Sequence, residues 1–247
     1  MKQKLWPKLW AAFSVLLVAC AYNRPITTPM QQVNYPALAD LPTEQKQLLI
    51  FLPGIGGKLS DFERYDFIRL LQEKYPAMDV KLLDAHFSYY RQSLIVNRLH
   101  NEVILPAKAQ GYCQIHLAGI SLGGYGALLY LREQGDTLID SISLLAPYLG
   151  EPKHYAHLLD ASKTAQDSDN KLNIWPWLTR LTETQKQLLY LAYGEQDRLV
   201  DGQNLLAGLL ASDHSFTMAG KHRWPVWRSL WQKGLSTNKL LPATTCP

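Results

Sequence analysis

Short apolar runs alternate with longer amphipathic stretches over residues 46–238 of this chain. The apolar runs are typical of buried strands, and they predict strands at 47–52, 79–85, 113–118, 139–145, 187–193 and 215–219. The stretches between them predict helices at 62–75, 93–110, 124–134, 202–211 and 225–233, the first with Ser60 or Asp61 as its N-cap. Strands separated by helices indicate an α/β fold with a mostly parallel central sheet and helices on both faces.

The segment of about residues 148–185 interrupts this alternation. It is too long for an ordinary connection, so we expect a partly helical, cap-like insertion. Aromatic residues gather in it, and we expect Tyr148, Trp175 and Trp177 to line a substrate pocket. Aromatic residues also build ordinary cores, and this second interpretation stays open at this stage.

The remaining segments flank one domain, as expected for 247 residues with 47% hydrophobic content. Residues 20–45 contain four prolines among polar residues and show no sustained period, which predicts a tether that follows an anchor. Residues 239–247 are interpreted as a C-terminal tail.

The first 19 residues differ in kind from the rest of the chain. Three lysines precede an apolar run, residues 9–19, that is short for a membrane-spanning helix and predicts an export signal. The run ends in Leu17-Val18-Ala19-Cys20, which resembles the lipobox of bacterial lipoproteins. The resemblance implies cleavage before Cys20, a lipid on its sulfur and acylation of its new amine, which together would provide stable anchoring. An uncleaved anchor helix is the alternative.

The residues after Cys20 bear on where such a lipoprotein would reside. In the sorting pattern of that family, an aspartate just after Ala21 favours the inner membrane, and Tyr22 stands there in this chain. The resemblance therefore implies a bacterial cell envelope protein on the outer membrane, facing the periplasm.

Net charge and cysteine content narrow the function classes further. The formal charge of +4 includes three lysines of the export signal, and the chain from Cys20 onward is nearly neutral without a basic cluster. Nucleic acid is therefore not an expected partner. Cys113 and Cys246 remain as an even pair in a compartment that permits disulfides, but the sequence leaves open whether they bond.

A candidate reaction centre lies at Gly119-Ile120-Ser121-Leu122-Gly123, between a predicted strand and a predicted helix. Such a G-x-S-x-G elbow holds a serine hydroxyl out of the chain on a tight turn, where it can act as a nucleophile. A glycine-rich turn with an incidental serine is the alternative interpretation.

A nucleophilic serine needs a base to take its proton, and the base needs an acid to fix its tautomer. In a parallel sheet, functional groups gather beyond the carboxyl ends of the strands, and both Asp197 and His222 directly follow predicted strands. In this order the chain resembles the α/β-hydrolases over about residues 46–235. The resemblance implies Ser121 as nucleophile, His222 as base and Asp197 as acid, with Glu195 and His214 as weaker alternatives for the acid and the base.

The resemblance also implies donors for a tetrahedral oxyanion. One is the backbone N–H of Leu122, the residue after the nucleophile. The other should come from the glycine-rich segment 53–57, where we expect Ile55, with Gly54 or Gly56 as alternatives, although the segment also suits a simple turn. Gly54 is expected to line the pocket as well.

The other histidines suggest no metal or cofactor. His116 lies in a predicted core strand and is expected to be a hydrogen-bonded interior residue. His154 and His157 could share a helix face, but they lack nearby cysteine or carboxylate ligands, so neither a metal nor another cofactor is predicted.

These observations predict hydrolysis of a carboxylic ester or thioester through an acyl-enzyme on Ser121. The serine argues against the relatives of this fold that use an aspartate nucleophile, the dehalogenases and epoxide hydrolases. Acyl transfer, or an inactive lipoprotein that binds or assembles envelope partners, remains an alternative. The substrate, which is either a lipid or medium-chain acyl ester or a small soluble ester, and any protein partner are not decided by the sequence.

Overall fold

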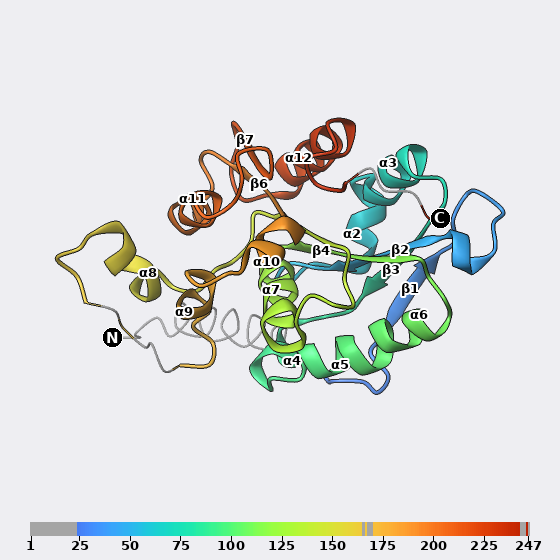
Figure 1. Ribbon diagram of the computed structural model, residues 1–247, viewed down its shortest axis with the longest axis horizontal. Coiled ribbons are helices and arrows are strands. Elements are labelled where there is room, and N and C mark those ends of the chain that lie inside the picture. The colour runs from blue at the N-terminus through green and yellow to red at the C-terminus, as the bar shows by residue number, and fades with distance from the viewer. Residues whose placement is uncertain (1–23, 165, 167–169, 243–245, 247) are drawn as a thin grey trace, which may run out of the picture.

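The computed structural model describes residues 24–164, 166, 170–242 and 246, and a seven-stranded sheet lies at its centre (Figure 1). The strand order is β1-β3-β2-β4-β5-β6-β7. The strands are β1 (Gln32–Tyr35), β2 (Gln47–Leu52), β3 (Met78–Leu83), β4 (Gln114–Ile120), β5 (Ser141–Leu145), β6 (Leu189–Gly194) and β7 (Ser215–Met218). Strands β2 to β7 are parallel, and β1 pairs antiparallel with β3 at one edge. The mostly parallel sheet that the sequence predicts is therefore confirmed.

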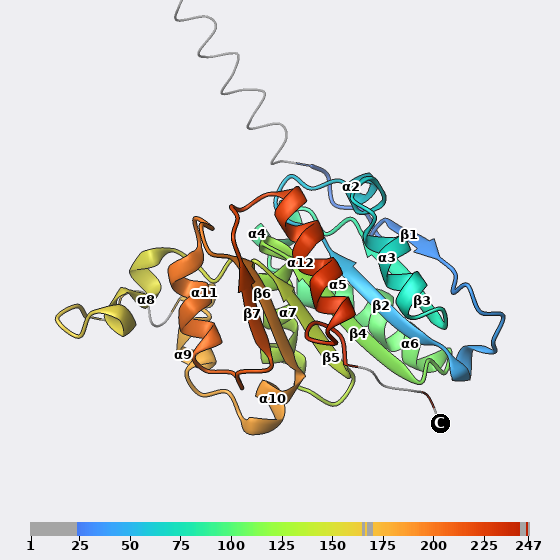
Figure 2. The same cartoon turned by 90° about the horizontal axis from the view of Figure 1, so that it is seen from above.

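Helices cover both faces of the sheet, as expected (Figures 1 and 2). On one face lie α2 (Leu59–Arg64), α3 (Phe67–Lys74), α11 (Val200–Ala207) and α12 (Trp224–Ser236). On the other lie α4 (Phe87–Arg91), α5 (Ile95–Leu99), the π-helical turn His100–Ile104, α6 (Leu105–Ala109) and α7 (Leu122–Gln134). The segment before β6 contributes the short helices α8 (Pro152–Leu159), α9 (Trp175–Leu178) and α10 (Glu183–Leu188). Among the described residues, none of the helices is both long and apolar enough to span a membrane.

The central strands are apolar because both of their faces are covered. All six residues of β2 are buried, and β4 is buried from its second residue onward. Strands buried on both faces show continuous apolar runs, which explains why the sequence identifies them readily. Their register brings Leu52 opposite Gly119 and Ile120 opposite Leu145, so the carboxyl ends of β2, β4 and β5 meet at one edge.

Several element boundaries differ from the sequence prediction. The helix expected at 62–75 is two helices, α2 and α3, which are separated at Asp66, where φ is 62°. Lys58, and neither Ser60 nor Asp61, occupies the N-cap of α2. Gln187 and Leu188 belong to α10 and not to the following strand, because the Thr182 hydroxyl and the Gln185 side chain cap that helix reciprocally.

Residues 24–45 differ from the predicted tether, because they pack on the domain. Strand β1 pairs with β3 from Gln32 to Tyr35, and Met30 is buried. The Arg24 guanidinium forms an ion pair with both oxygens of Asp84, which directly follows β3. Cys20 and the predicted export signal lie outside the described residues.

The C-terminal segment is also more than a tail. Leu240 and Leu241 are fully buried, and the Ser143 hydroxyl donates a hydrogen bond to the Leu240 carbonyl. Cys246 forms a disulfide with Cys113, a partly buried residue that immediately precedes β4. The pairing that the sequence leaves open is therefore present in the structure.

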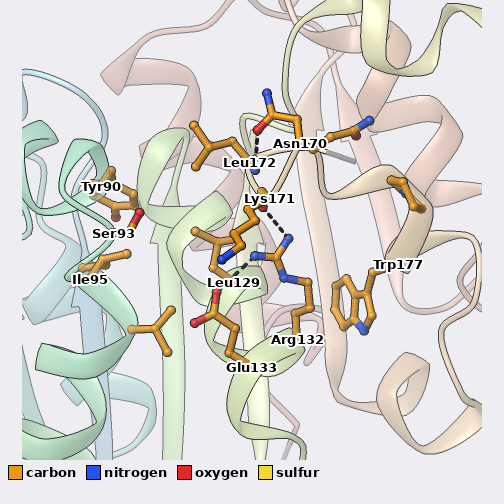
Figure 3. Close-up of a pocket in the computed structure, with 13 residues that line it drawn as sticks. Tyr90, Ser93, Ile95, Leu129, Arg132, Glu133, Asn170, Lys171, Leu172 and Trp177 are labelled. Atoms are coloured by element: carbon orange, nitrogen blue, oxygen red, sulfur yellow. Dashed lines mark hydrogen bonds and ion pairs between the residues drawn. The ribbon is translucent and has the colours of Figure 1, made fainter. Parts of the chain in front are cut away.

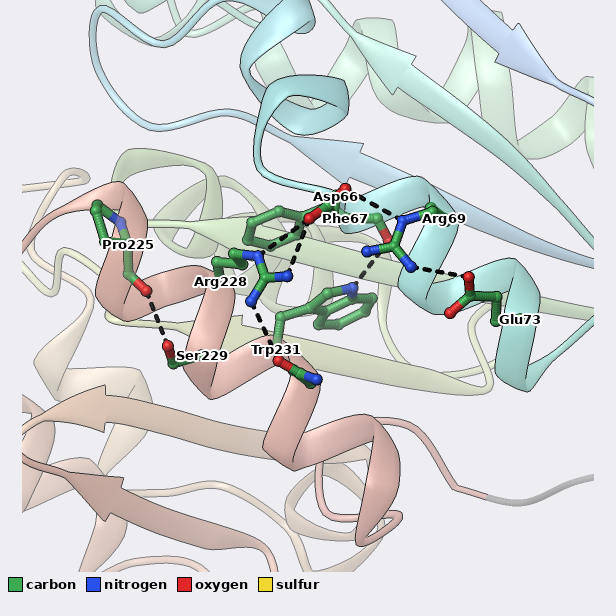
Figure 4. Close-up of polar contacts among 9 residues, drawn as sticks. Asp66, Phe67, Arg69, Glu73, Pro225, Arg228, Ser229 and Trp231 are labelled. Atoms are coloured by element: carbon green, nitrogen blue, oxygen red, sulfur yellow. Dashed lines mark hydrogen bonds and ion pairs between the residues drawn. The ribbon is translucent and has the colours of Figure 1, made fainter.

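Helix α12 is fixed against α3 by polar contacts as well as by packing (Figure 4). The Trp231 indole N–H donates a hydrogen bond to the Phe67 carbonyl over 3.0 Å, and Arg228 lies 2.9 Å from the Asp66 carboxylate. Aromatic rings of Phe51, Phe67 and Trp231 pack edge-on or stacked at the same place. Because α12 begins only two residues after His222, this docking positions the loop that carries His222.

Candidate active site

Ser121 lies on a sharp turn between β4 and α7, with φ of 52° and ψ of −113°. This conformation is rare for a residue with a side chain, and it requires that the neighbours allow close approach. A Cβ on Gly119 would collide with the Gly123 backbone, and a Cβ on Gly123 would collide with the Leu52 carbonyl. Both glycines of the motif are therefore explained by steric need, as a nucleophile elbow requires.

Hydrogen bonds hold the elbow from both sides. The Ser121 N–H donates to the Leu145 carbonyl over 3.0 Å, and the Ser121 carbonyl accepts from the N–H groups of Tyr125 and Tyr148. Ser121 is 4% exposed, and its hydroxyl is held at a fixed place just beyond the carboxyl end of β4.

The loops after β6 and β7 lie against each other at the same edge. The N–H of Gln196 donates to the Gly220 carbonyl over 2.9 Å, and Glu195 bonds to the Met218 carbonyl in the same way. A side chain at Gly194 would collide with the Gly220 backbone. This close contact brings Asp197, from the first loop, next to His222, from the second.

A continuous chain of hydrogen bonds joins Asp197, His222 and Ser121. The Nδ1 atom of His222 lies 2.8 Å and 3.0 Å from the two carboxylate oxygens of Asp197, and its Nε2 atom lies 2.9 Å from the Ser121 hydroxyl. Because an ionised carboxylate only accepts, Nδ1 carries the proton, and Nε2 is left to accept from the hydroxyl. This arrangement is capable of withdrawing a proton from Ser121.

Burial and packing fix these groups in place. The Asp197 side chain is fully buried, and it also accepts a hydrogen bond from the Leu199 N–H over 2.9 Å. The His222 ring packs edge-on against Trp227, with ring centroids 4.8 Å apart. The imidazole is thereby held in one orientation between its two partners.

The alternative acid, Glu195, and the alternative base, His214, form hydrogen bonds with other groups. Glu195 accepts from the Thr217 hydroxyl at the surface. His214 is buried, and its Nδ1 bonds to the Leu189 carbonyl while its ring stacks on Tyr190. Neither residue shares a hydrogen bond with Ser121 or His222 in the described part of the chain.

Two backbone segments beside Ser121 suit the expected oxyanion donors. Leu122 is the first residue of α7, and the first N–H groups of a helix have no acceptor within the helix. In the turn 54–57, the Gly57 N–H bonds to the Gly54 carbonyl and Gly56 has φ of 72°, so the Ile55 N–H takes no part in closing the turn. Gly54 lies so close that an added Cβ would be 3.3 Å from that of Ser121.

A cavity of about 230 Å³ opens beside Ser121. It is lined by Gly54, Ile55, Gly56, Gly57, Ser121, Arg198, His222, Trp224 and Trp227. We call this the catalytic cavity. Its volume is small for a ligand pocket, which commonly measures about 300–1,000 Å³.

The two tryptophans of the insertion do not line the catalytic cavity. Trp175 is 1% exposed and packs against Tyr155 with ring centroids 5.2 Å apart, because it supports the insertion from inside. Trp177 lines a separate cavity of about 540 Å³, beside the residues of α7 that lie farthest from Ser121 (Figure 3). Tyr148 contacts Ser121 through its backbone, and its ring packs on Tyr125.

Arg198, Trp224 and Trp227 are the lining residues that sequence reasoning missed. Arg198 directly follows Asp197, and the two tryptophans follow His222 by two and five residues. The same strand-end argument that selects Asp197 and His222 could have identified them, since side chains next to a strand end reach the same edge.

A second serine–histidine pair lies in the core. His116 Nδ1 and the Ser141 hydroxyl are 2.7 Å apart across β4 and β5, and both residues are fully buried. Burial, with a smaller contribution from Lys108, lowers the pKa of His116 to about 3. The expectation that His116 is a hydrogen-bonded interior residue is therefore confirmed. No cluster of three metal-ligating side chains occurs within the described residues.

The chain is similar to solved structures of esterases. A ferulic acid esterase superposes with a TM-score of 0.56 at 12% identity, covering 88% of this chain and 100% of the other. The S-formylglutathione hydrolase of Staphylococcus aureus superposes with 0.54 at 16% identity, covering 86% and 98%. An esterase from Thermogutta terrifontis superposes with 0.54 at 14% identity, covering 86% and 91%. No protein-family model and no curated protein sequence matches the chain. The chain therefore has the α/β-hydrolase fold.

Proposed function

We propose that this protein is a serine hydrolase that cleaves a carboxylic ester or thioester through an acyl-enzyme on Ser121. The observation that carries the proposal is the hydrogen-bonded chain from Asp197 through His222 to the Ser121 hydroxyl, at the mouth of a cavity. The names of the structural neighbours, which include two esterases and a hydrolase of S-formylglutathione, support the same reaction class.

The first half of the reaction forms the acyl-enzyme. His222 Nε2 takes the hydroxyl proton while Ser121 Oγ attacks the carbonyl carbon, and Asp197 stabilises the imidazolium. The N–H groups of Leu122 and Ile55 bind the oxyanion that forms on the carbonyl oxygen. The tetrahedral intermediate collapses as His222 gives its proton to the leaving atom, which is oxygen in an ester and sulfur in a thioester, and an alcohol or a thiol departs.

The second half releases the acid. His222 takes a proton from water, and the resulting hydroxide attacks the acyl carbon. The second intermediate collapses with proton return to Ser121 Oγ, and a carboxylic acid leaves. Acyl transfer would use an alcohol in place of water at this step, and it is the alternative that the same site allows.

The size of the catalytic cavity favours a short acyl group. A volume of about 230 Å³ accommodates an ester with a few carbon atoms on either side, and the tryptophans expected to receive a long chain lie elsewhere. We therefore propose small esters, in preference to lipids, as the substrate class.

A fluorophosphonate probe tests the proposal without a choice of substrate. We expect the full-length protein to be labelled, the Ser121→Ala variant to be unlabelled, and Ser141→Ala to be labelled at the wild-type rate. Absence of labelling in a folded wild-type protein would instead favour the inactive, binding role. A panel of 4-nitrophenyl esters from acetate to decanoate, with and without an added alcohol acceptor, then separates chain lengths and distinguishes hydrolysis from transfer.

We further propose that the protein acts at the bacterial cell envelope, anchored through acylated Cys20 to the outer membrane. The lipobox-like residues 17–20 support this location, as does the Cys113–Cys246 disulfide, because disulfides persist in oxidising compartments. Radiolabelled palmitate should be incorporated into the wild-type protein but not into Cys20→Ser. Equal incorporation by both would contradict the anchor.

A further inference from the structure

A second cavity adjoins the catalytic cavity across the turn that carries Ile55. It measures about 470 Å³, and Gly56 and Gly57 line both cavities. Its other lining residues are Arg24, Gln31, Lys58, Leu59, Asp84, His86 and Phe87. We call it the adjoining cavity. The two cavities are therefore neighbours that share the glycines of this turn.

The two cavities are lined by more cationic than anionic side chains. In the adjoining cavity, Asp84 is the carboxylate, and both of its oxygens bind the Arg24 guanidinium. Lys58 forms no ion pair with any residue that the structure describes. In the catalytic cavity, Arg198 is an exposed cation and likewise has no ion-pair partner among the described residues. The lining thus offers two positive charges that nothing in the described chain neutralises.

The position of Arg198 relates it to one side of the substrate. In ester cleavage, His222 must give its proton to the leaving oxygen, so the leaving group lies beside His222. Arg198 directly follows Asp197, which is bonded to the other nitrogen of His222, and both Arg198 and His222 line the catalytic cavity. Arg198 therefore lines the catalytic cavity together with the residue beside which a leaving group would lie.

We propose that the natural substrate is an ester whose alcohol part carries an anionic group, a carboxylate or a phosphate, and that Arg198 binds this group. The inference rests on the proposed function and names its substrate class. A guanidinium presents a planar fork of N–H donors that matches the oxygens of either anion. Lys58 adds positive potential from the adjoining cavity and so raises the local concentration of an anionic substrate.

The test compares two substrates that differ in one charge. The first is 4-acetoxybenzoate, whose leaving phenol carries a carboxylate, and the second is its neutral carboxamide analogue. We expect kcat/KM of the wild-type protein to favour the carboxylate, and Arg198→Gln to lower kcat/KM for the carboxylate about tenfold, since hydrogen bonds to charged groups are the stronger class. The same variant should lower kcat/KM for the carboxamide much less, because that substrate makes no ion pair, so the ratio of the two kcat/KM values should fall.

Matched variants separate this effect from a general loss of positive charge. Arg180→Gln removes an exposed arginine that lines neither cavity, and it should leave both substrates unaffected. Arg198→Lys should recover part of the preference, and Lys58→Gln should reduce it by about threefold, as expected for an exposed charge in solvent. Salt at 0.5 M should weaken the preference of the wild-type protein more than that of Arg198→Gln, in which only the Lys58 charge remains.

Failure of this inference can be distinguished from failure of the proposed function. Hydrolysis of both substrates at equal rates, unchanged in Arg198→Gln, would overturn the anionic leaving group and leave the esterase intact. A preference for an anion on the acyl side, measured with 4-nitrophenyl hemisuccinate against 4-nitrophenyl butyrate, would also overturn it. If Ser121→Ala matches the wild-type protein on every ester, the proposed function itself fails.

Discussion

Two serine–histidine pairs are hydrogen-bonded within the described residues, and their hydrogen bonds are nearly the same length. Ser121 and His222 are 2.9 Å apart, and Ser141 and His116 are 2.7 Å apart. The first pair lies beyond the carboxyl ends of the strands and lines a cavity, whereas the second joins β4 and β5 inside the sheet. A serine–histidine hydrogen bond is therefore insufficient as a sign of catalysis.

The surroundings of each imidazole make the difference. His222 has a carboxylate on its second nitrogen, so its charged form would be stabilised after proton transfer. In His116, the second nitrogen is buried without a partner among the described residues, and burial lowers its pKa to about 3. A protonated His116 would be an unpaired charge in the core, so this pair serves packing and polar satisfaction.

Exchange of each serine for alanine gives the largest contrast. Ser121→Ala should lower kcat for ester hydrolysis by about 10⁵-fold or more, because the nucleophile is lost while the binding site remains. Ser141→Ala should retain kcat within about twofold, since its hydroxyl bonds only inside the core. Both are measured with 4-nitrophenyl acetate on protein checked for folding by circular dichroism. A comparable loss in both variants would remove the functional distinction between the pairs.

The second largest effect should follow from a change at Asp197, the carboxylate partner of His222. Asp197→Asn should lower kcat by about 10³- to 10⁴-fold with the fold retained, because an amide no longer fixes the tautomer or stabilises the imidazolium. Asp201→Asn, an exposed carboxylate four residues later, serves as the matched control and should have little effect. An Asp197→Asn variant of wild-type activity would mean that His222 works without its acid.

The two serine variants should rank in the opposite order when stability is measured in place of activity. Ser141→Ala should lower the free energy of unfolding by about 2 kcal/mol, because it leaves His116 Nδ1 buried without its partner. Ser121→Ala removes a hydroxyl at a cavity, and its cost should be smaller. Urea unfolding at pH 7 compares the two, and an equal or larger cost for Ser121→Ala would contradict the structural role of Ser141.

The smallest effect concerns the pH dependence of stability. His116 is neutral in the fold, with a pKa of about 3, and would bind a proton near pH 6.5 in the unfolded chain. Between these two pH values the unfolded state therefore binds more protons than the folded state. The contribution of His116 to the free energy of unfolding is complete above about pH 6.5 and is lost as the pH falls. Between pH 7 and pH 5.5 the loss should be about 1 kcal/mol. The His116→Gln variant should lose this part of the pH dependence when the free energy of unfolding is measured with urea. An unchanged pH dependence would contradict the role of His116.

Much of the sheet and of the hydrogen-bonded chain could be predicted because both depend on local pattern. The strands β2 and β4 are largely apolar runs, and Ser121, Asp197 and His222 each lie within four residues of a strand end. Strand order was not needed to bring these side chains together, since parallel strands share one carboxyl edge.

The elements that were missed depend on contacts distant in sequence. Strand β1 has three exposed residues and one partly buried residue, so it lacks the apolar pattern of an inner strand, and only its pairing with β3 defines it. Trp175 and Trp177 belong to one short helix, yet one supports the core and the other faces a separate cavity. Composition cannot distinguish these roles, because each is decided by the partner surface.

The two ends of the described chain are fastened at opposite edges of the sheet. Arg24 binds Asp84, just beyond the carboxyl end of β3, and it lines the adjoining cavity. Cys246 is bonded to Cys113, just before the amino end of β4. A support or fluorescent reporter joined at the C-terminus would therefore lie at the opposite edge of the sheet from the catalytic cavity, whereas a bulky fusion immediately before Arg24 would lie beside the adjoining cavity.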